Sequence, residues 1–533
     1  MPAGQAKSLG AFYTPPELAE ILVEWGVRQA SDRVLDPSCG GYVFLDLAMK
    51  RLYRLGASER QARRLAWGID CDPAVHQVGL TRGLPPEHLY PADFFDISSR
   101  DLPTFAANLG NPPYVRYQGW DAEASQAHAR AEAAGVKLTR LASSWAPFIV
   151  HGTSFLAPGG RMGQVLPAEL LHAQYAQPIL GFLRQSFQAV TIVLFEEKVF
   201  PEVLEEVVLL FADGYSFGPA EGIGLVSVKD AQALRLSQID GRGQGYLDES
   251  MPLLSLLDAR TQELYRHLTA DARVRRLGDI AAVDIGVVTG NNRFFVRSAA
   301  EITARKWDKK LFRSIISKAS DVSGAKLTKV DIAALEARGR ATRLLVTAGA
   351  TRSAIASIQD LLSTGETEKV DKTYKTSRRS PWWGVPLPKI GVPDLFLTYM
   401  NDAFPRLAHN EAGALSTNTV HMVAVKESLS APALAVGFYN SLTLLSAELV
   451  GRSYGGGTLK LEPTEAEALL IPPIDRALAT QLDETDALVR ARDLQGLLSV
   501  IDPLVLTGLV SDKELALLRR ARERLLRRRR ARG

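Results

Sequence analysis

The chain has 533 residues, of which 46% are hydrophobic and 23% charged, with a formal net charge of +4. This length exceeds what one hydrophobic core usually holds, so we expect two or three domains. No apolar run reaches the roughly 18–20 residues that span a bilayer, and the first residues lack the order of a signal peptide, so we expect a cytoplasmic protein without a membrane partner. The only cysteines, Cys39 and Cys71, exclude a disulfide framework, and eight scattered histidines show no zinc-ligand spacing, so we expect no metal.

In the first third of the chain, short apolar segments alternate with helical ones, which predicts an α/β fold with a doubly wound, mostly parallel sheet. An amphipathic stretch over about 45–65 predicts one crossover helix between the first two strands, and a further helix is predicted over 252–268. The alternation fades over 215–235. The predicted strands are 33–36, 66–70, 105–110, 161–167, 189–195 and 205–213.

The later part of the chain has a different pattern. Residues 275–475 show short strands, many turns and interleaved aromatic and basic residues, which indicates a second, mixed α+β domain. The last stretch is helical and carries nine arginines between Arg519 and Arg532. It could lie on DNA or dock on a partner subunit, but we favour a solvated tail. The predicted domains are therefore 1–235, a helical linker over 236–274, 275–475, and a helical C-terminal region over 476–533.

The charge is distributed unevenly. Residues 1–240 contain 20 Lys and Arg against 26 Asp and Glu, whereas the remainder contains 43 against 33. A basic second half favours contact with a polyanion such as nucleic acid. A solvated basic surface without a partner is the alternative.

Asn111-Pro112-Pro113-Tyr114 directly follows a predicted strand, where ligand sites of open α/β sheets lie. The prolines fix φ and remove backbone donors, which leaves the Asn111 amide oxygen and the Pro112 carbonyl to accept from one amino group. Tyr114 offers an aromatic face to a planar ring. The motif thus predicts a site for an amino-bearing ring, although such a loop also arises by chance.

Three further segments each carry an acid at a strand end. Asp36-Pro37-Ser38-Cys39-Gly40 is a glycine-containing turn before a helix, suited to close approach of a small ligand. Asp70 ends the next strand, where an acid can bind ribose hydroxyls, and Asp93-Phe94 supplies another acid beside an aromatic ring. No phosphate-binding glycine motif is present. The order of these segments indicates one site rather than unrelated turns.

Together these motifs resemble the gamma-class (TaqI-like) N6-adenine DNA methyltransferases of restriction–modification and phage-defence systems. The resemblance covers roughly the first 215 residues motif by motif and the later region more loosely. It implies a class I methyltransferase fold (Rossmann-like), followed by a target-recognition domain and a helical tail. It also implies S-adenosyl-L-methionine as cofactor and methylation of N6 of an adenine flipped out of double-stranded DNA. Other restriction or defence subunits are further partners that it suggests.

The resemblance also implies roles for individual residues. Tyr13 and Thr14 would close over the methionine part of the cofactor, and Asp36 would hold its amino group. Asp70 would bind the ribose, and Asp93 the cofactor adenine. The residues expected to complete the cofactor site are Pro37, Cys39, Gly40, Cys71, Phe94 and Phe148. Phe200 would face Tyr114 across the flipped base, although a Phe before a strand is also a common core residue.

Three later segments, 286–295, 374–383 and 451–460, resemble parts of target-recognition domains in this family. Basic residues beside glycines and small hydroxyl residues suit contacts to phosphates and base edges. The residues expected to bind DNA are Arg293, Lys375, Arg378, Arg379, Arg452 and Lys460.

Two departures from the family pattern leave alternatives open. Tyr42 stands where the cofactor turn usually has a second glycine, and 143–148 lacks an acid or amide at its start. The chain could therefore be a weakly active or inactive cofactor-binding DNA-recognition subunit. The Asn111 motif also suits N-methyltransferases acting on RNA or on protein amides, but the long basic region behind it favours DNA. No nuclease motif is evident.

Overall fold

The computed structural model describes residues 14–115, 124–139, 142–171, 176–197, 199, 206–239, 245–426, 429–454 and 456–531. The chain forms two compact units, the first chiefly from residues up to Asp258 and the second from Ala259 to Arg529. Their division falls inside the predicted linker, and most of the C-terminal helical region belongs to the second unit. The functional domain borders drawn from the sequence stay predictions.

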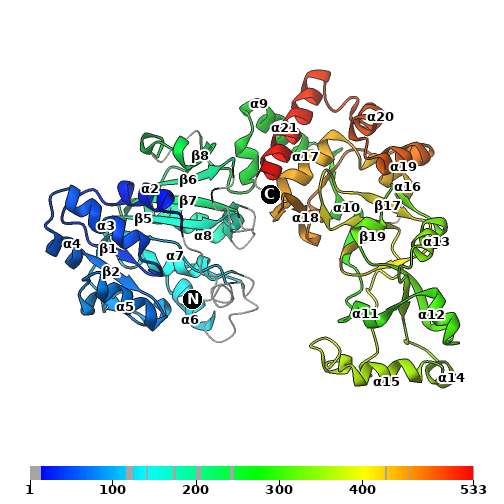
Figure 1. Ribbon diagram of the computed structural model, residues 1–533. Helices are drawn as coiled ribbons and strands as arrows, with labels where there is room; N and C mark the ends of the chain where they lie inside the picture. Colours follow the sequence, from blue (N-terminus) through cyan, green and yellow to red (C-terminus); the bar gives the residue numbers. More distant parts are fainter. Residues whose placement is uncertain are drawn as a thin grey trace. The chain divides into compact units, whose positions relative to one another are not determined.

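An eight-stranded sheet in the order β3-β2-β1-β4-β5-β7-β6-β8 forms the centre of the first unit (Figure 1). Among the described strands, β7 alone runs antiparallel to its neighbours β5 and β6. The predicted doubly wound, mostly parallel class I methyltransferase fold is therefore confirmed. The strands are β1 (Val34–Asp36), β2 (Ala66–Ile69), β3 (Leu89–Tyr90), β4 (Phe105–Gly110), β5 (Leu156–Pro167), β6 (Phe187–Phe195), β7 (Val207–Tyr215) and β8 (Ile223–Val228).

Some predicted elements of this unit were wrong. The single crossover helix is two helices, α3 (Val43–Arg54) and α4 (Glu59–Leu65), because Gly56 takes a φ of +109° and the Ser58 side chain caps α4. Strand β8 lies where the alternation fades, since it is buried on both faces and has no polar face to show a period of two. The helix expected over 252–268 is a 3-10 turn at the end of the first unit, followed by α9 (Ala259–Ala270), the first helix of the second unit.

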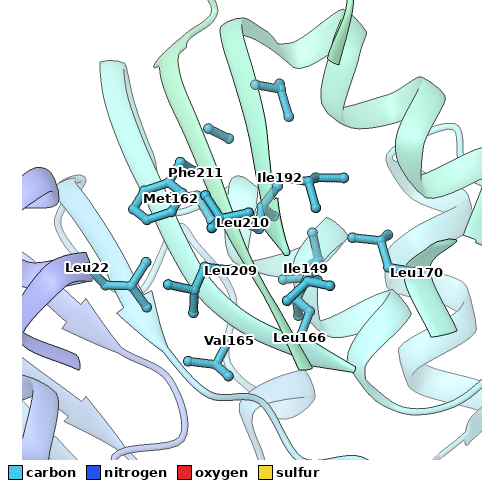
Figure 2. Close-up of a cluster of buried hydrophobic side chains, with 14 of the residues drawn as sticks. Leu22, Ile149, Met162, Val165, Leu166, Leu170, Ile192, Leu209, Leu210 and Phe211 are labelled. Carbon is cyan, nitrogen blue, oxygen red and sulfur yellow. The ribbon is translucent and has the colours of Figure 1, made fainter. Parts of the chain in front are cut away.

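Helices cover both faces of the sheet. A Cβ on Gly163 of β5 would meet Leu22 and Trp25 of α2 (Pro16–Gly26), whereas the neighbouring Met162 lies beside α7 (Trp145–Thr153). Successive strand residues point to opposite faces, so α2 and α7 lie on opposite sides. Figure 2 shows the resulting core, with Leu22 on one side of the strands and Ile149 of α7 on the other.

The second unit is mixed α+β, as predicted. Three of its sheets have the orders β10-β19-β15-β17-β13, β11-β14-β12-β18 and β16-β21-β20. Their strands are β10 (Ala281–Ile285), β11 (Val296–Arg297), β12 (Phe312–Ile316), β13 (Lys326–Leu327), β14 (Arg343–Leu345), β15 (Leu395–Thr398), β16 (Met400–Asn401), β17 (Leu407–Asn410), β18 (Leu415–Ser416), β19 (Val420–Val425), β20 (Arg452–Tyr454) and β21 (Thr458–Lys460). Its longer helices are α9, α13 (Lys329–Ala337), α15 (Gln359–Thr367), α17 (Ser441–Val450), α19 (Leu482–Ala491), α20 (Leu494–Leu506) and α21 (Asp512–Ala531).

The arginine-rich tail is helix α21, and the expectation of a solvated tail was wrong. Leu518 and Leu525 are buried along one face, and Arg529 is only 5% exposed. The Arg529 guanidinium lies 2.9 Å from a Glu448 carboxylate oxygen of α17 and donates to the Asp402 carbonyl at 2.7 Å. The near-helical spacing of the leucines indicates a buried face, but the high density of charge favoured a solvated helix.

No single helix in the described part of the chain is long and apolar enough to cross a membrane. The bent pair α16 (Ala431–Gly437) and α17 passes that test together, by length and composition only. The residues of both helices are largely buried, as in core helices.

Candidate functional site

The acids and the asparagine of the predicted site follow neighbouring parallel strands. Asp36 ends β1, Asp70 follows β2 and Asn111 follows β4. Strand β1 lies between β2 and β4, so the three residues come together at the carboxyl edge of the sheet. Ligands bind at this edge in open α/β sheets.

The turn after β1 is held against the end of β2. The Gly40 N–H donates to Asp70 Oδ2 at 2.9 Å, and the Cys39 N–H donates to the Ile69 carbonyl at 3.0 Å. Gly40 has a φ of +39°, in the region that favours glycine. The other Asp70 oxygen accepts from the Asp72 N–H at 2.9 Å. Asp70 thus fixes two backbone turns, and Pro37 and Cys71 lie in them.

Asp36 is the most deeply buried carboxyl of this edge, with 1% of its surface exposed. Its Oδ1 accepts from the Ser38 N–H at 3.1 Å. The pKa of Asp36 is raised to about 8, chiefly by burial; the Ser38 N–H bond opposes this shift and the nearby Asp70 charge adds to it. A Cβ on Gly110 would lie 2.9 Å from Asp36 Oδ1, so glycine lets β4 pass this carboxyl.

Tyr42, the departure from the family pattern, does not project from the turn. Its backbone has a φ of +65°, the left-handed conformation that glycine would adopt, and its side chain is fully buried. The ring packs with Cys39 and Leu84, and a Cβ on Gly79 of α5 (Pro73–Thr81) would collide with its hydroxyl. A small residue in α5 therefore makes room for the tyrosine.

An aromatic turn follows β3. Asp93 Oδ1 accepts from the Phe95 N–H at 2.8 Å and so caps the 3-10 turn over Phe94–Asp96. The Phe94 ring is buried, with its centroid 4.7 Å from that of Phe148 of α7. Three residues predicted to hold an adenine, Asp93, Phe94 and Phe148, are thus in one cluster.

The loop over Asn111–Tyr114 is fixed at both ends. Ser38 Oγ donates to the Asn111 carbonyl at 3.0 Å, which joins this loop to the Asp36 turn. Ser144 Oγ donates to the Pro113 carbonyl and accepts from the Val115 N–H at 2.9 Å. Both serines lie in segments that the sequence singled out, but neither was assigned a role, because a serine in a motif does not reveal its hydrogen-bond partner.

Tyr114 is held from within the core. Its hydroxyl lies 2.6 Å from Asn111 Oδ1 and 3.0 Å from the Val165 carbonyl oxygen, and the residue is 8% exposed. The ring that is predicted to stack on a base is therefore rigidly oriented, with little surface open.

Two predicted site residues, Tyr13 and Phe200, lie outside the described residues. Thr14, the neighbour of Tyr13, is 7% exposed and precedes α2. Within the described residues, no three His, Cys, Asp or Glu side chains form a group that could hold a metal ion.

In the second unit, half of the predicted DNA contacts make internal bonds. Arg379 donates to the carbonyls of Thr289 and Val288 at 2.7 and 2.8 Å. Arg452 pairs with Glu465, and Lys460 with Glu462, each at 2.6 Å. Arg379 thus holds the backbone, whereas Arg452 and Lys460 are engaged by carboxylates of the same unit.

The other half, Arg293, Lys375 and Arg378, are exposed. The Arg378 guanidinium carbon lies 3.7 Å from the centre of the Tyr374 ring, and Tyr374 is 64% exposed. A planar cation stacked on an exposed aromatic ring is suited to contact phosphates or bases.

Comparisons with known proteins cover most of the chain. Residues 2–214 match the family N-6 DNA Methylase, and residues 252–506 match the family Type II methyltransferase M.Eco57I, C-terminal domain. The chain is 26% identical over 495 residues to the Type II methyltransferase M.XamI of Xanthomonas campestris pv. amaranthicola, covering 88% of this chain and 86% of that protein. It is 22% identical over 367 residues to the Type II methyltransferase M.AccI of Acinetobacter calcoaceticus, covering 67% of this chain and 66% of that protein.

A solved structure has a similar fold. The Type IIL restriction-modification enzyme MmeI, in complex with DNA, matches with a TM-score of 0.60 and 13% identity, covering 98% of this chain and 80% of that chain. The two family matches follow one another along the chain. The finer gamma-class assignment stays a prediction, but the chain belongs to the N6 DNA methyltransferases of restriction–modification type.

Proposed function

We propose that the protein transfers the methyl group of S-adenosyl-L-methionine to N6 of an adenine that is flipped out of duplex DNA. The observation that carries this proposal is the bond from Ser38 Oγ to the Asn111 carbonyl. It couples the turn between β1 and α3, which is the proposed cofactor turn, to the Asn111–Tyr114 loop, which presents acceptors for an amino group. The proposed setting is a cytoplasmic restriction–modification or phage-defence system, with other subunits as further partners.

The residues at the sheet edge fit the cofactor. Its ammonium group suits Asp36, its ribose diol suits Asp70, and its adenine suits Asp93 together with the Phe94 and Phe148 rings. The ammonium favours the charged form of the buried Asp36 carboxyl, whose pKa is raised to about 8. When bound, the cofactor supplies an electrophilic methyl group.

The catalytic loop acts mainly by positioning. The Asn111 amide oxygen and the Pro112 carbonyl accept the amino protons of adenine, which directs the nitrogen lone pair away from the ring. Asn111 Oδ1 already accepts from the Tyr114 hydroxyl, but a carbonyl oxygen has two lone pairs and can accept again. We assign no general base, since the amino group loses its proton during or after transfer.

Base extrusion costs a few kcal/mol, and stacking on Tyr114 and Phe200 offsets part of it. In the second unit, Arg293, Lys375 and Arg378 are the proposed contacts to DNA, because they are exposed. The bonds of Arg379 to two carbonyls support a role in holding the backbone, and the ion pairs of Arg452 and Lys460 support a structural role as well.

Methyl transfer from labelled cofactor to mixed-sequence duplex DNA, with analysis of the digested nucleosides, tests this proposal. Wild type should form N6-methyladenine. Asn111→Ala should lower kcat by about 100-fold or more, as when a preorganised polar group is removed from an active site. Its affinity for S-adenosylhomocysteine should change less than about threefold.

Asn111→Asp is the matched control, because it keeps an acceptor oxygen at the same place and should retain more activity than the alanine variant. Full activity of Asn111→Ala, or transfer to RNA or protein instead of DNA, would contradict the proposal. Cofactor binding without transfer to any DNA would favour a recognition subunit.

A further inference from the structure

Helix α7 contacts two parts of the site that are far apart in the sequence. Ser144, directly before its first turn, holds the catalytic loop through Pro113 and Val115. His151, in its last turn, lies 3.2 Å from the Phe94 carbonyl oxygen and 3.0 Å from that of Ile97. One helix therefore holds the backbone of both the Asn111 loop and the aromatic turn after β3.

His151 acts as a neutral hydrogen-bond donor. It is 5% exposed, and its ring centroid lies 4.6 Å from that of Phe94 and 5.1 Å from that of Phe155. Burial lowers the pKa of His151 to about 4, so the imidazole is uncharged at neutral pH. Because both partners of Nε2 are carbonyl oxygens, this nitrogen must carry the proton.

The aromatic turn is held by its carbonyl groups. His151 bonds to the carbonyls of Phe94 and Ile97, while Gln126 and Arg130 of α6 (Ala124–Ala133) donate to the Phe95 carbonyl at 3.1 and 3.2 Å. Fixing these three carbonyls fixes the backbone that carries the Asp93 carboxylate and the Phe94 ring.

Helix α7 is itself locked onto the sheet. Asn108 of β4 donates from Nδ2 to the Gly152 carbonyl at 3.0 Å, and Gln164 of β5 donates to Asn108 Oδ1 at 3.0 Å. A Cβ on Gly152 would lie 2.8 Å from Asn108 Nδ2, so the helix packs closely there. Ile149 reaches into the core shown in Figure 2. The helix cannot slide without breaking these bonds.

We propose that His151 is a positioning residue for the adenine end of the cofactor, and that α7 sets the spacing between the aromatic turn and the Asn111 loop. This inference rests on the proposed function, because it takes Asp93 and Phe94 as the cofactor-adenine site. His151 touches neither methyl group nor target base in this scheme. Its effect passes through the backbone of the turn.

Calorimetric titration with S-adenosylhomocysteine gives a readout that does not depend on turnover. His151→Leu removes the donor and should raise the Kd about tenfold. His151→Gln places an amide nitrogen near the position of Nε2 and should stay within about threefold of wild type. Thr153→Val is the matched control, since within the described residues its hydroxyl bonds to the Ile149 carbonyl of the same helix, and it should leave the Kd unchanged.

The two ends of the helix should affect different kinetic constants. His151→Leu should raise the KM for the cofactor with kcat changed less than about threefold, whereas Ser144→Ala should lower kcat and leave the cofactor Kd unchanged. If the leucine variant does not fold, His151→Asn takes its place in the comparison with His151→Gln, because the asparagine amide is too short to reach the turn. The inference would be overturned if His151→Gln had the same Kd as His151→Leu or His151→Asn.

Asp93→Asn separates this inference from the proposed function. If wild type fails to bind S-adenosylhomocysteine, or Asp93→Asn binds as tightly as wild type, the proposed cofactor site is wrong. If Asp93→Asn weakens binding and His151→Leu does not, only the role of His151 is wrong.

Discussion

The acids at the edge of the first sheet and the arginines of the second unit are used in different ways. At the sheet edge, Asp36, Asp70 and Asp93 all bond to backbone N–H groups of their own turns. On the second unit, Arg379 is bonded to two carbonyls whereas Arg378, its neighbour, is exposed and stacked on Tyr374. Adjacent residues of one type thus have opposite environments.

The difference lies in how strongly the fold dictates position. Parallel strands bring the residues that follow them to one edge of the sheet, so the position of a motif after such a strand can be predicted from residue pattern alone. The segments of the second unit are short and joined by irregular turns, and no periodicity assigns their side chains to a face. Burial therefore decides which cations hold the fold and which are available to a ligand.

The largest effect that this comparison predicts is on folding, at a buried cation of the second unit. Arg529→Met leaves the Glu448 carboxylate buried without its partner, and should lower the free energy of unfolding by about 3–5 kcal/mol. Arg527→Met removes a side chain that is 75% exposed and should cost less than about 0.5 kcal/mol. Urea denaturation followed by circular dichroism measures both.

Replacing both partners tests the cause. The double variant Glu448→Leu with Arg529→Met removes the unpaired charge and should recover much of the lost stability. Equal losses in the Arg529 and Arg527 variants would show that α21 is not docked through this pair.

The next effect separates the two neighbouring arginines. Arg379→Ala loses two bonds to backbone carbonyls and should lower the free energy of unfolding by about 1.5–3 kcal/mol. Arg378→Ala should leave stability unchanged but weaken DNA binding about fivefold, and should reduce the slope of log affinity against log salt by about one phosphate contact. Fluorescence anisotropy with labelled duplex over a salt series gives both quantities. The comparison fails if the two variants lose stability and DNA affinity in the same proportion.

Much of the first unit could be predicted from the sequence, and the reason is visible in particular residues. Asp36, Asp70 and Asn111 follow apolar strands, so their common edge is a consequence of topology. Ser38, Ser144 and His151 could not be found in this way, because each acts through a backbone carbonyl of a segment distant in sequence. A hydrogen bond to a backbone group leaves no pattern in residue type.

The docking of α21 was missed for a related reason. Its charge density is typical of a solvated helix, and only the structure shows that Arg522 and Arg529 face carbonyl and carboxylate oxygens of the same unit. The burial of the Tyr42 ring could not be predicted from the sequence either, since Gly79, a residue of a separate helix, provides the space for it.

The last prediction returns to the sheet edge and uses pH. The pKa of Asp36 is raised from 3.8 to about 8, so between these values the folded protein binds one more proton than the unfolded chain. The free energy of unfolding should therefore fall as pH rises through this window, and the fall should level off above about pH 8. Cofactor binding should show the opposite sign, because an ammonium group beside Asp36 favours the carboxylate.

We accordingly expect the Kd for S-adenosylmethionine to decrease by up to about tenfold per pH unit between pH 6 and 7.5, with a proton released to the buffer on binding. Calorimetry in two buffers of different ionisation enthalpy measures that proton. Asp36→Asn cannot release it, so this variant should bind the cofactor weakly, with a Kd that does not depend on pH. Its thermal stability should not decline towards pH 8. A pH-independent Kd in wild type would place the ammonium group away from Asp36, and the first unit would then hold its cofactor by the ribose and adenine ends alone.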